Sequence, residues 1–421
     1  MGLTSQQVDI IKATVPVLEQ HGLAITTTFY KNMLDEHTEL HGMFNTANQV
    51  TRHQQKALAG ALYAYAANID NLAALNDTVE LITQRHASLY IKPEHYKIVG
   101  TYLLAAMKIV LGDALTPEIH DAWAAAYWLL ADLLIEKEAS LYRSAGDWND
   151  WREFKIEKKV PESDEITSFY LKPVDGKPLP SFRPGQYISV MVDVPALNYP
   201  QARQYSLSDM PRPDYYRISV KKETGVNPSN PQAAGHPGYI SNILHDIKKE
   251  GDVVLVSHPY GDFYLADFDG EKATSKNPIV LISAGVGLTP LTSILNTITS
   301  KSGQTDRKVH FVHGVRRGSA RAFKDHIQNT AKAHSNLKVT FFNSLPSSTE
   351  KQGVDYHHAE RVNLHKLDRN DDLFLDDKTT EYYLCGPESF MTAMKKQLLE
   401  LGVEPARIKL ELFGTGGVPA S

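Results

Sequence analysis

Three polar side chains in the first third of the chain fall on helix faces that are otherwise apolar. His86 shares such a face with Ile82 and Leu89, and Tyr96 and Glu138 lie on comparable faces of two later helical segments. A buried carboxylate without a partner is strongly unfavourable, so Glu138 needs a hydrogen-bond donor beside it. A metal-bound imidazole whose second nitrogen bonds to a carboxylate, with a tyrosine fixing that carboxylate, would satisfy all three residues. The alternative is three unrelated polar groups with ordinary partners, since a histidine on a helix is more often structural than metal-binding.

A second group of candidate residues precedes His86 in the chain. The segment "TTFYKNML" contains Tyr30, "HGMFN" contains Phe44, and "RHQQKAL" contains Gln54 and Leu58. A phenylalanine at a helix corner, then a glutamine on the next helix with an apolar residue four positions later, resembles the haem pocket of a globin. Aromatic residues at helical spacing usually belong to a hydrophobic core, so the ordered set, rather than any one residue, indicates a haem site.

A glycine-rich turn near residue 285 has the layout of a phosphate-binding site. In "IVLISAGVGLTPLTSIL" a short apolar run is followed by Gly285 and Gly287, and Thr289 and Pro290 open a helical segment. Glycines let the backbone approach a pyrophosphate, and a helix N-terminus offers free N–H groups and the positive end of its dipole. Many strand-to-helix turns carry this pattern for steric reasons alone, and Pro290 stands where the standard dinucleotide motif has its third glycine.

A second turn of this kind leads from Cys385, Gly386 and Pro387, in "YLCGPESFM", into another helical segment. The carboxyl ends of parallel strands meet at one edge of an open sheet, so we expect the two turns to face one crevice. Two further motifs precede them. In "RQYSLS" Arg203 can pair with a phosphate, and in "GYISNIL" Ser241 is placed to cap a helix.

Three stretches with different hydrophobic periods must position these residues. Up to about residue 143 apolar residues recur every three or four positions, which predicts packed helices. Segments such as "GQYISVMVDV" then alternate apolar with polar residues between Pro, Gly and Asp turns, as in an antiparallel barrel. After "DFDGEKATSKNP", short apolar runs separated by helical stretches predict a parallel sheet built from βαβ units. We therefore expect a multidomain protein with an all-α domain, an antiparallel β-barrel domain and an α/β parallel-sheet domain.

The composition excludes several classes of protein. The chain has 421 residues, of which 42% are hydrophobic and 22% charged, as in soluble globular proteins of two or three domains. Its net charge of −5 gives no reason to expect a nucleic-acid partner. Cys385 is the only cysteine, so no intramolecular disulfide can form. The N-terminal residues show no secretory signal and no apolar run is long enough for an integral membrane segment, so we expect a cytoplasmic protein.

Residues 150 to 421 resemble the ferredoxin-reductase superfamily, because the four motifs occur in its order. In that superfamily a barrel binds FAD through an R-x-Y-[ST] motif and an α/β domain binds a nicotinamide cofactor. By resemblance, the FAD contacts are Tyr187, Arg203, Gln204, Tyr205, Ser206, Gly238 and Ser241. The nicotinamide dinucleotide contacts are Gly285, Val286, Gly287, Leu288, Thr289, Pro290, Cys385, Gly386 and Pro387. The segment that would cover the flavin ring is Glu411, Leu412, Phe413, Gly414 and Thr415, where Thr415 replaces a proline found in many relatives.

A globin followed by such a reductase resembles the flavohaemoglobin family over essentially the whole chain. We expect a globin domain at residues 1–147, an FAD-binding β-barrel at 148–267 and an NAD(P)-binding α/β domain at 268–421. The resemblance implies that His86 ligates the iron of haem b and that Tyr96 and Glu138 are its hydrogen-bonding partners. It also implies the other haem-pocket residues: Tyr30 and Gln54 on the distal side, Leu58 restricting access, Phe44 on the porphyrin, and Arg85 beside the proximal histidine, where many relatives have lysine.

The family's activity is nitric oxide dioxygenation, in which NO and O2 become nitrate at a haem reduced by NADH or NADPH through FAD. Two other functions stay open. One is an oxygen- or NO-binding globin with an attached methaemoglobin reductase, and the other is a flavin-dependent ferric or quinone reductase whose helical domain is incidental. No obligate protein partner is implied. The choice between NADH and NADPH is also open, because Arg316, Arg317 and Arg321 either accept a 2′-phosphate or are solvated charges.

Overall fold

The computed structural model describes residues 2–44, 52–225, 237–300 and 306–413. The chain forms two compact units. One consists of Met1–Arg152, Ser189–Arg203 and Val256–Asp262, and the other of Glu153–Ile188, Gln204–Leu255 and Phe263–Ser421. The first unit therefore joins the helical part of the chain to two short stretches of the barrel sequence that follows.

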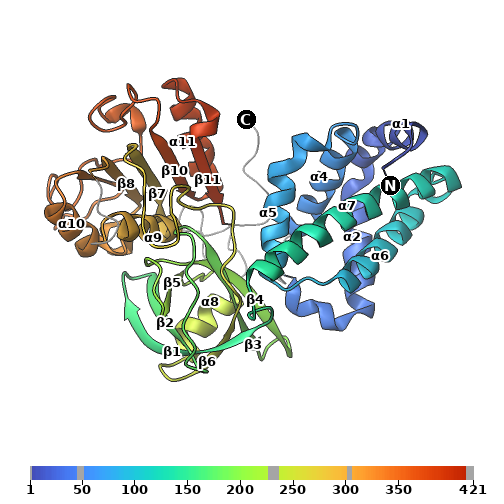
Figure 1. Cartoon of the computed structure of the whole chain (residues 1–421), viewed down its shortest axis with the longest axis horizontal. Coiled ribbons are helices and arrows are strands. Elements are labelled where there is room, and N and C mark those ends of the chain that lie inside the picture. Colours follow the sequence, from blue (N-terminus) through green and yellow to red (C-terminus); the bar gives the residue numbers. More distant parts are fainter. Residues whose placement is uncertain (1, 45–51, 226–236, 301–305, 414–421) are drawn as a thin grey trace. The chain divides into compact units, whose positions relative to one another are not determined.

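Helices make up most of the first unit (Figure 1). They are α1 (Ser5–Ala13), α2 (Val15–Glu36), α4 (His53–Ala67), α5 (Asn76–Ala87), α6 (Pro93–Leu111) and α7 (Pro117–Ser144), with 3₁₀ turns η1 (Thr38–Met43), η2 (Leu72–Leu75) and η3 (Gly112–Ala114). Their starts follow from local chemistry: Thr116 accepts a hydrogen bond from the backbone of Ile119, and proline occupies the first position of α6 and α7. Apolar faces that include Phe29, Leu103 and Trp123 form the core.

The antiparallel part of the chain forms one six-stranded sheet. Its strands are β1 (Arg152–Pro161), β2 (Ile166–Pro173), β3 (Tyr187–Val194), β4 (Tyr199–Ser206), β5 (Tyr216–Lys221) and β6 (Val253–Val256), in the order β4-β3-β6-β1-β2-β5. Ile156 of β1 lies opposite Leu171 of β2, and Phe169 of β2 lies opposite Ile218 of β5. Leu207, directly after β4, forms an antiparallel bridge with Ile218, so the two ends of the strand order meet as in a barrel.

The C-terminal part is a parallel sheet of five strands with helices on both faces (Figure 1). The strands are β7 (Ile279–Ala284), β8 (Val309–Val315), β9 (Leu337–Asn343), β10 (Glu381–Gly386) and β11 (Ile408–Leu412), in the order β11-β10-β7-β8-β9. Helices α9 (Leu288–Ile298) and α10 (Lys324–Ala333) share a core with one face, and α11 (Glu388–Glu400) shares a core with the other. The chain moves from β7 to β8 and β9 and then returns to the far side of β7, so a topological switch point lies between β7 and β10.

The expected fold class is confirmed, with helices first, then an antiparallel sheet and then a parallel sheet. Strand β11 is the difference, because no strand is expected there and only its last two residues, Glu411 and Leu412, belong to the segment expected to cover a cofactor. The short helices of the reductase part are α8 (Tyr239–Asn242), the π-helix η4 (Ile243–Ile247), η5 (Gly285–Gly287), η6 (Gly318–Ala320), η7 (Leu364–Lys366) and η8 (Pro405–Arg407). Within the described ranges, no helix has both the length and the apolar character needed to cross a membrane.

Candidate functional site

His86, Tyr96 and Glu138 form one hydrogen-bonded group, and each comes from a different helix. His86 lies in the last turn of α5, Tyr96 in the first turn of α6 and Glu138 in α7. Nδ1 of His86 is 2.9 Å from the Tyr96 hydroxyl oxygen and 2.9 Å from Oε1 of Glu138. The Tyr96 hydroxyl donates to that same Oε1 at 2.5 Å. Glu138 is only 2% exposed, so its carboxylate is buried between two donors.

This geometry determines which nitrogen of His86 carries the proton. An ionised carboxylate can only accept hydrogen bonds, so both the Tyr96 hydroxyl and Nδ1 of His86 donate to Glu138. Burial raises the pKa of Tyr96, and the charge of Glu138 raises it further, so the phenol keeps its proton. Nε2 of His86 is then left with a lone pair, and the side chain is 35% exposed. A neutral imidazole held in this way is the form that ligates a metal ion, so the three residues fit a haem.

The distal candidates form a second group. Tyr30 of α2 is 7% exposed, burial raises the pKa of its phenol, and its hydroxyl is hydrogen-bonded to the side chain of Gln54 on α4. The ring of Phe44 meets the Tyr30 ring edge-on, with 5.6 Å between centroids. Leu58 packs against the same core. A buried, protonated phenol held by an amide and surrounded by apolar groups can donate one hydrogen bond to a small ligand.

Arg85 adds a positive charge next to His86. Its side chain is half-buried, and its charge lowers the pKa of Asp262, whereas burial, the larger effect, raises that pKa. Arg85 therefore lies within electrostatic range of residues 256–262 of the barrel sequence, inside the first compact unit.

The two glycine-rich turns lie directly against one another. Gly285 has a φ of +56°, and Gly287 packs so closely on the backbone of Cys385 and Gly386 that a Cβ atom there has no space. Both turns follow the carboxyl ends of adjacent strands, β7 and β10. They therefore meet at the topological switch point, which is where open α/β sheets bind ligands.

Several side chains of these turns serve the packing instead of facing solvent. The Thr289 hydroxyl donates to the Val286 carbonyl at 3.0 Å, and Leu288 and Pro290 are buried. Cys385 is fully buried, and burial, with the charge of Glu411 adding to it, raises the pKa of its thiol well above the usual range. The backbone, and not these side chains, is what the turns can offer to a pyrophosphate, while Pro387 is exposed as the N-cap of α11.

The barrel motif occupies β4. The guanidinium of Arg203 donates to the Ala202 carbonyl at 2.7 Å and to the side chain of Gln201 at 2.8 Å. Along the rest of the motif Gln204 is exposed, Tyr205 half-buried and Ser206 buried. Tyr187, at the start of β3, is 6% exposed.

The prediction that Ser241 caps a helix is wrong. Gly238 is the N-cap residue of α8, and Ser241 lies inside that helix. Its hydroxyl accepts from the backbone N–H of Glu223 at 3.2 Å and donates to the Gly238 carbonyl at 3.3 Å. The helix begins earlier than predicted because the backbone N–H of Gly238 donates to the Glu223 carbonyl and so fixes the turn at that residue.

The terminal segment extends the parallel sheet. Glu411 and Leu412 belong to β11, opposite Cys385 and Gly386 of β10. Phe413 follows the strand and is 42% exposed, as suits a residue that packs on another ring. Gly414 and Thr415 lie outside the described residues.

The three arginines near β8 have different environments. Arg321 is 3% exposed, donates to the Asp355 carbonyl and packs its guanidinium 4.5 Å from the centre of the Phe341 ring. Burial lowers its pKa to about 10. Arg316 and Arg317 are exposed. Arg321 is therefore buried and paired within the protein. Of these three arginines, Arg316 and Arg317 are the ones exposed to a 2′-phosphate.

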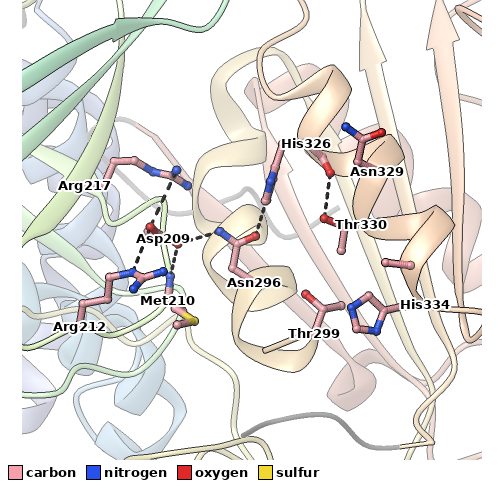
Figure 2. Close-up of a pocket in the computed structure, with 11 residues that line it drawn as sticks. Asp209, Met210, Arg212, Arg217, Asn296, Thr299, His326, Asn329, Thr330 and His334 are labelled. Carbon is pink, nitrogen blue, oxygen red and sulfur yellow. Dashed lines mark hydrogen bonds and ion pairs between the residues drawn. The ribbon is translucent and has the colours of Figure 1, made fainter. Parts of the chain in front are cut away.

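The structure also contains a cavity that the sequence did not indicate. Its volume is about 520 Å³, and none of the predicted site residues lines it (Figure 2). The carboxylate of Asp209 accepts from Nδ2 of Asn296 at 2.8 Å, and Oδ1 of Asn296 is 2.7 Å from Nε2 of His326 (Figure 2). Asp209 and Asn296 are 87 positions apart, so no local motif could have linked them.

Comparison with known proteins defines the class of this chain. The globin family model matches residues 27–134, and the model described as "Oxidoreductase NAD-binding domain" matches residues 281–396. The structure of flavohemoglobin from Malassezia yamatoensis with bound FAD and heme has a TM-score of 0.82 and 29% identity, covering 98% of this chain and 100% of that one. The FAD/NAD-binding domain of nitric oxide dioxygenase from Vibrio cholerae has a TM-score of 0.52 and 35% identity, covering 63% of this chain and 99% of that one. The fold and site are therefore those of a globin joined to an FAD- and NAD-binding oxidoreductase.

Relatives of full length narrow this class further. The flavohemoprotein of Rhizobium meliloti (strain 1021) is 48% identical over 417 residues, which is 98% of either chain. The chain belongs to the flavohemoprotein family, and the resemblance drawn from its motifs is confirmed.

Proposed function

We propose that this flavohemoprotein is a nitric oxide dioxygenase that converts NO and O2 to nitrate, with electrons passing from NADH or NADPH through FAD to haem b. The observation that carries the proposal is the buried group of His86, Tyr96 and Glu138, with Nε2 of His86 free to ligate iron. The Vibrio cholerae domain named for this activity supports it at 35% identity. Burial of the one cysteine, Cys385, is compatible with action in the cytoplasm.

His86 would hold the haem, and the residues of the barrel and parallel sheet would hold FAD and the nicotinamide cofactor. When bound, the haem supplies the iron at which O2 and NO react, and the flavin takes two electrons from the nicotinamide cofactor and passes them on one at a time. Glu138 accepts a hydrogen bond from the Nδ1–H group of His86, which makes the imidazole a stronger electron donor. Tyr96 donates to Glu138 and keeps its carboxylate in place.

On the distal side Tyr30 keeps its proton and can donate a hydrogen bond to O2 in the pocket. Gln54 holds the Tyr30 hydroxyl in position, while Phe44 and Leu58 surround it with apolar surface. In the reductase part, the turns at Gly287 and Gly386 would bind the pyrophosphate through their backbone. Exposed Phe413 would cover the flavin ring.

The test is NO consumption by the purified holoprotein with NADH in air-saturated buffer. The proposal expects rapid consumption with one nitrate formed per NO, and much slower consumption when Tyr30 is replaced by phenylalanine. Slow, non-catalytic consumption by the unmodified protein would instead indicate an oxygen- or NO-binding globin with an attached reductase. A purified protein that cannot be loaded with haem, and so has no Soret band, would refute both and leave a flavin reductase.

A further inference from the structure

The helix that carries His86 is fastened by two segments of the barrel sequence that belong to the same compact unit. The backbone N–H of Gly261 donates to Oε1 of Gln84 at 2.9 Å. The Ser189 hydroxyl donates to the Ser88 hydroxyl at 3.1 Å. Gln84 and Ser88 stand two positions before and two positions after His86. Two segments of the reductase sequence are therefore hydrogen-bonded to the chain just before and just after His86.

A third hydrogen bond holds the turn that follows α5. The backbone N–H of His258 donates to the Tyr90 hydroxyl at 3.0 Å. Tyr90 itself has a φ of +54°, a conformation unusual for a residue with a side chain. His258 and Gly261 belong to one short stretch, residues 256–262, so this stretch contacts the end of α5 and the turn beyond it.

Gln84 is the member of this set that is also linked, through Glu80 and Lys137, to the helix of Glu138. It is 8% exposed, and its amide is fully oriented: Oε1 accepts from Gly261, and Nε2 donates to Glu80 at 2.9 Å. The other carboxylate oxygen of Glu80 accepts from Lys137 at 3.1 Å. Lys137 precedes Glu138 on α7, so α5 and α7 are joined once through Glu80 and Lys137 and once through His86 and Glu138.

Gly261 is suited to this contact because of its backbone. Its φ is +124°, which residues with a Cβ avoid, and it is buried. An N–H group buried at this position needs an acceptor, and the Gln84 side chain supplies one. The pairing of Gly261 with Gln84 therefore satisfies a constraint on the barrel segment and a constraint on α5 at the same time.

We propose that Gln84 is a positioning residue, through which residues 256–262 of the reductase sequence hold α5 and so set the hydrogen bond between Nδ1 of His86 and Glu138. The inference rests on the proposed function in that His86 is taken as the haem ligand. Besides supplying electrons, the reductase sequence then controls how strongly His86 donates to Glu138. Without the bond to Gly261, the last turn of α5 moves more freely and the His86–Glu138 bond weakens.

The experiment measures the iron–histidine stretching frequency by resonance Raman spectroscopy on the dithionite-reduced holoprotein. The Glu138→Gln variant defines the shift produced by a weakened Nδ1 hydrogen bond. Gln84→Met keeps the side-chain volume but removes both hydrogen bonds, and we expect a smaller shift toward lower frequency, in the same direction as Glu138→Gln. Thr78→Ala, at an exposed position of the same helix, is the matched control and should leave the frequency unchanged.

An unshifted frequency in Gln84→Met, or a shift in Thr78→Ala as large as that in Gln84→Met, would overturn the proposal. Amide hydrogen exchange supplies a readout that does not depend on haem: the peptide covering residues 256–262 should exchange faster in Gln84→Met than in Thr78→Ala. If the unmodified protein shows no iron–histidine band, the assignment of His86 fails, and exchange alone decides the role of Gln84. Unchanged exchange then overturns the anchoring by Gln84, and faster exchange supports it.

Discussion

Replacing Glu138 by glutamine should raise the reduction potential of the haem, by at most about 65 mV. Both hydrogen bonds, from His86 and from Tyr96, end on Oε1 of Glu138. A glutamine carbonyl can accept both, so the substitution changes a charged acceptor into a neutral one and preserves the geometry. Hydrogen bonds to charged groups contribute roughly 1.5–3 kcal/mol and neutral ones roughly 0.5–1.5 kcal/mol, so the donation by His86 weakens by about 1 to 1.5 kcal/mol. The bond is present in both oxidation states, so only the difference between its two contributions shifts the potential. For one electron, a tenfold change in equilibrium corresponds to about 59 mV, which makes about 65 mV the upper limit.

The sign follows from the charge of the iron. A carboxylate that accepts from Nδ1 makes the imidazole more electron-rich and favours the ferric state, so a neutral acceptor favours the ferrous state. Spectroelectrochemical titration of the Soret band measures the potential directly. Glu136→Gln removes the same charge from an exposed position two residues earlier on α7 and is the matched control. A potential that does not rise above that of Glu136→Gln, or that falls, would refute the assignment of Glu138 to the proximal group.

Three further predictions concern the distal pocket, the nucleotide turns and the buried side chain of His313. Tyr30→Phe removes a hydrogen bond worth roughly 0.5–1.5 kcal/mol, so O2 should leave the reduced protein about two- to tenfold faster in stopped-flow experiments, and an unchanged rate would exclude Tyr30 from the pocket. Gly287→Ala forces a Cβ against the Cys385 backbone and should raise the KM for NADH by more than about tenfold with ferricyanide as acceptor, whereas Gly60→Ala, which meets no neighbouring atom, should not. Burial, with the charge of Arg321 adding to it, lowers the pKa of His313 from 6.5 to about 3, so its contribution to stability is complete above pH 6.5 and declines below it. That contribution should fall by roughly 2 kcal/mol between pH 7.5 and pH 5 in urea unfolding, and equal pH dependence in His313→Gln would contradict this.

Features that depend on neighbouring residues could be predicted from the sequence, whereas features that depend on residues far apart in the chain could not. The helical period placed His86 and Glu138 on inward faces, and the cost of a buried carboxylate was enough to predict a partner for Glu138. The two glycine turns were recognisable because each is local, and the order of strands brought them together as expected for an open parallel sheet.

Other features could not be predicted because their partners are remote or their backbone conformation is special. Gln84 accepts from a residue 177 positions later, and nothing about a glutamine on a helix indicates such a partner. Ser241 looked like a capping residue because serine favours that position, but Gly238 begins the helix instead. Strand β11 is different, because its five residues, IKLEL, alternate apolar with charged side chains, which is a strand pattern that the sequence does offer.

The link between Gly261 and Gln84 also has a consequence for the order of events during synthesis. On a ribosome, His86, Tyr96 and Glu138 have all been added by residue 138, so the globin helices can collapse around them while the barrel is still untranslated. The bond that secures α5 becomes possible only after residue 261 has been added, more than a hundred residues later. If Gln84 has the proposed role, a nascent chain of intermediate length would hold His86 in a looser helix than the finished protein does. The proximal side of the proposed haem site would then be completed only when the reductase sequence arrives.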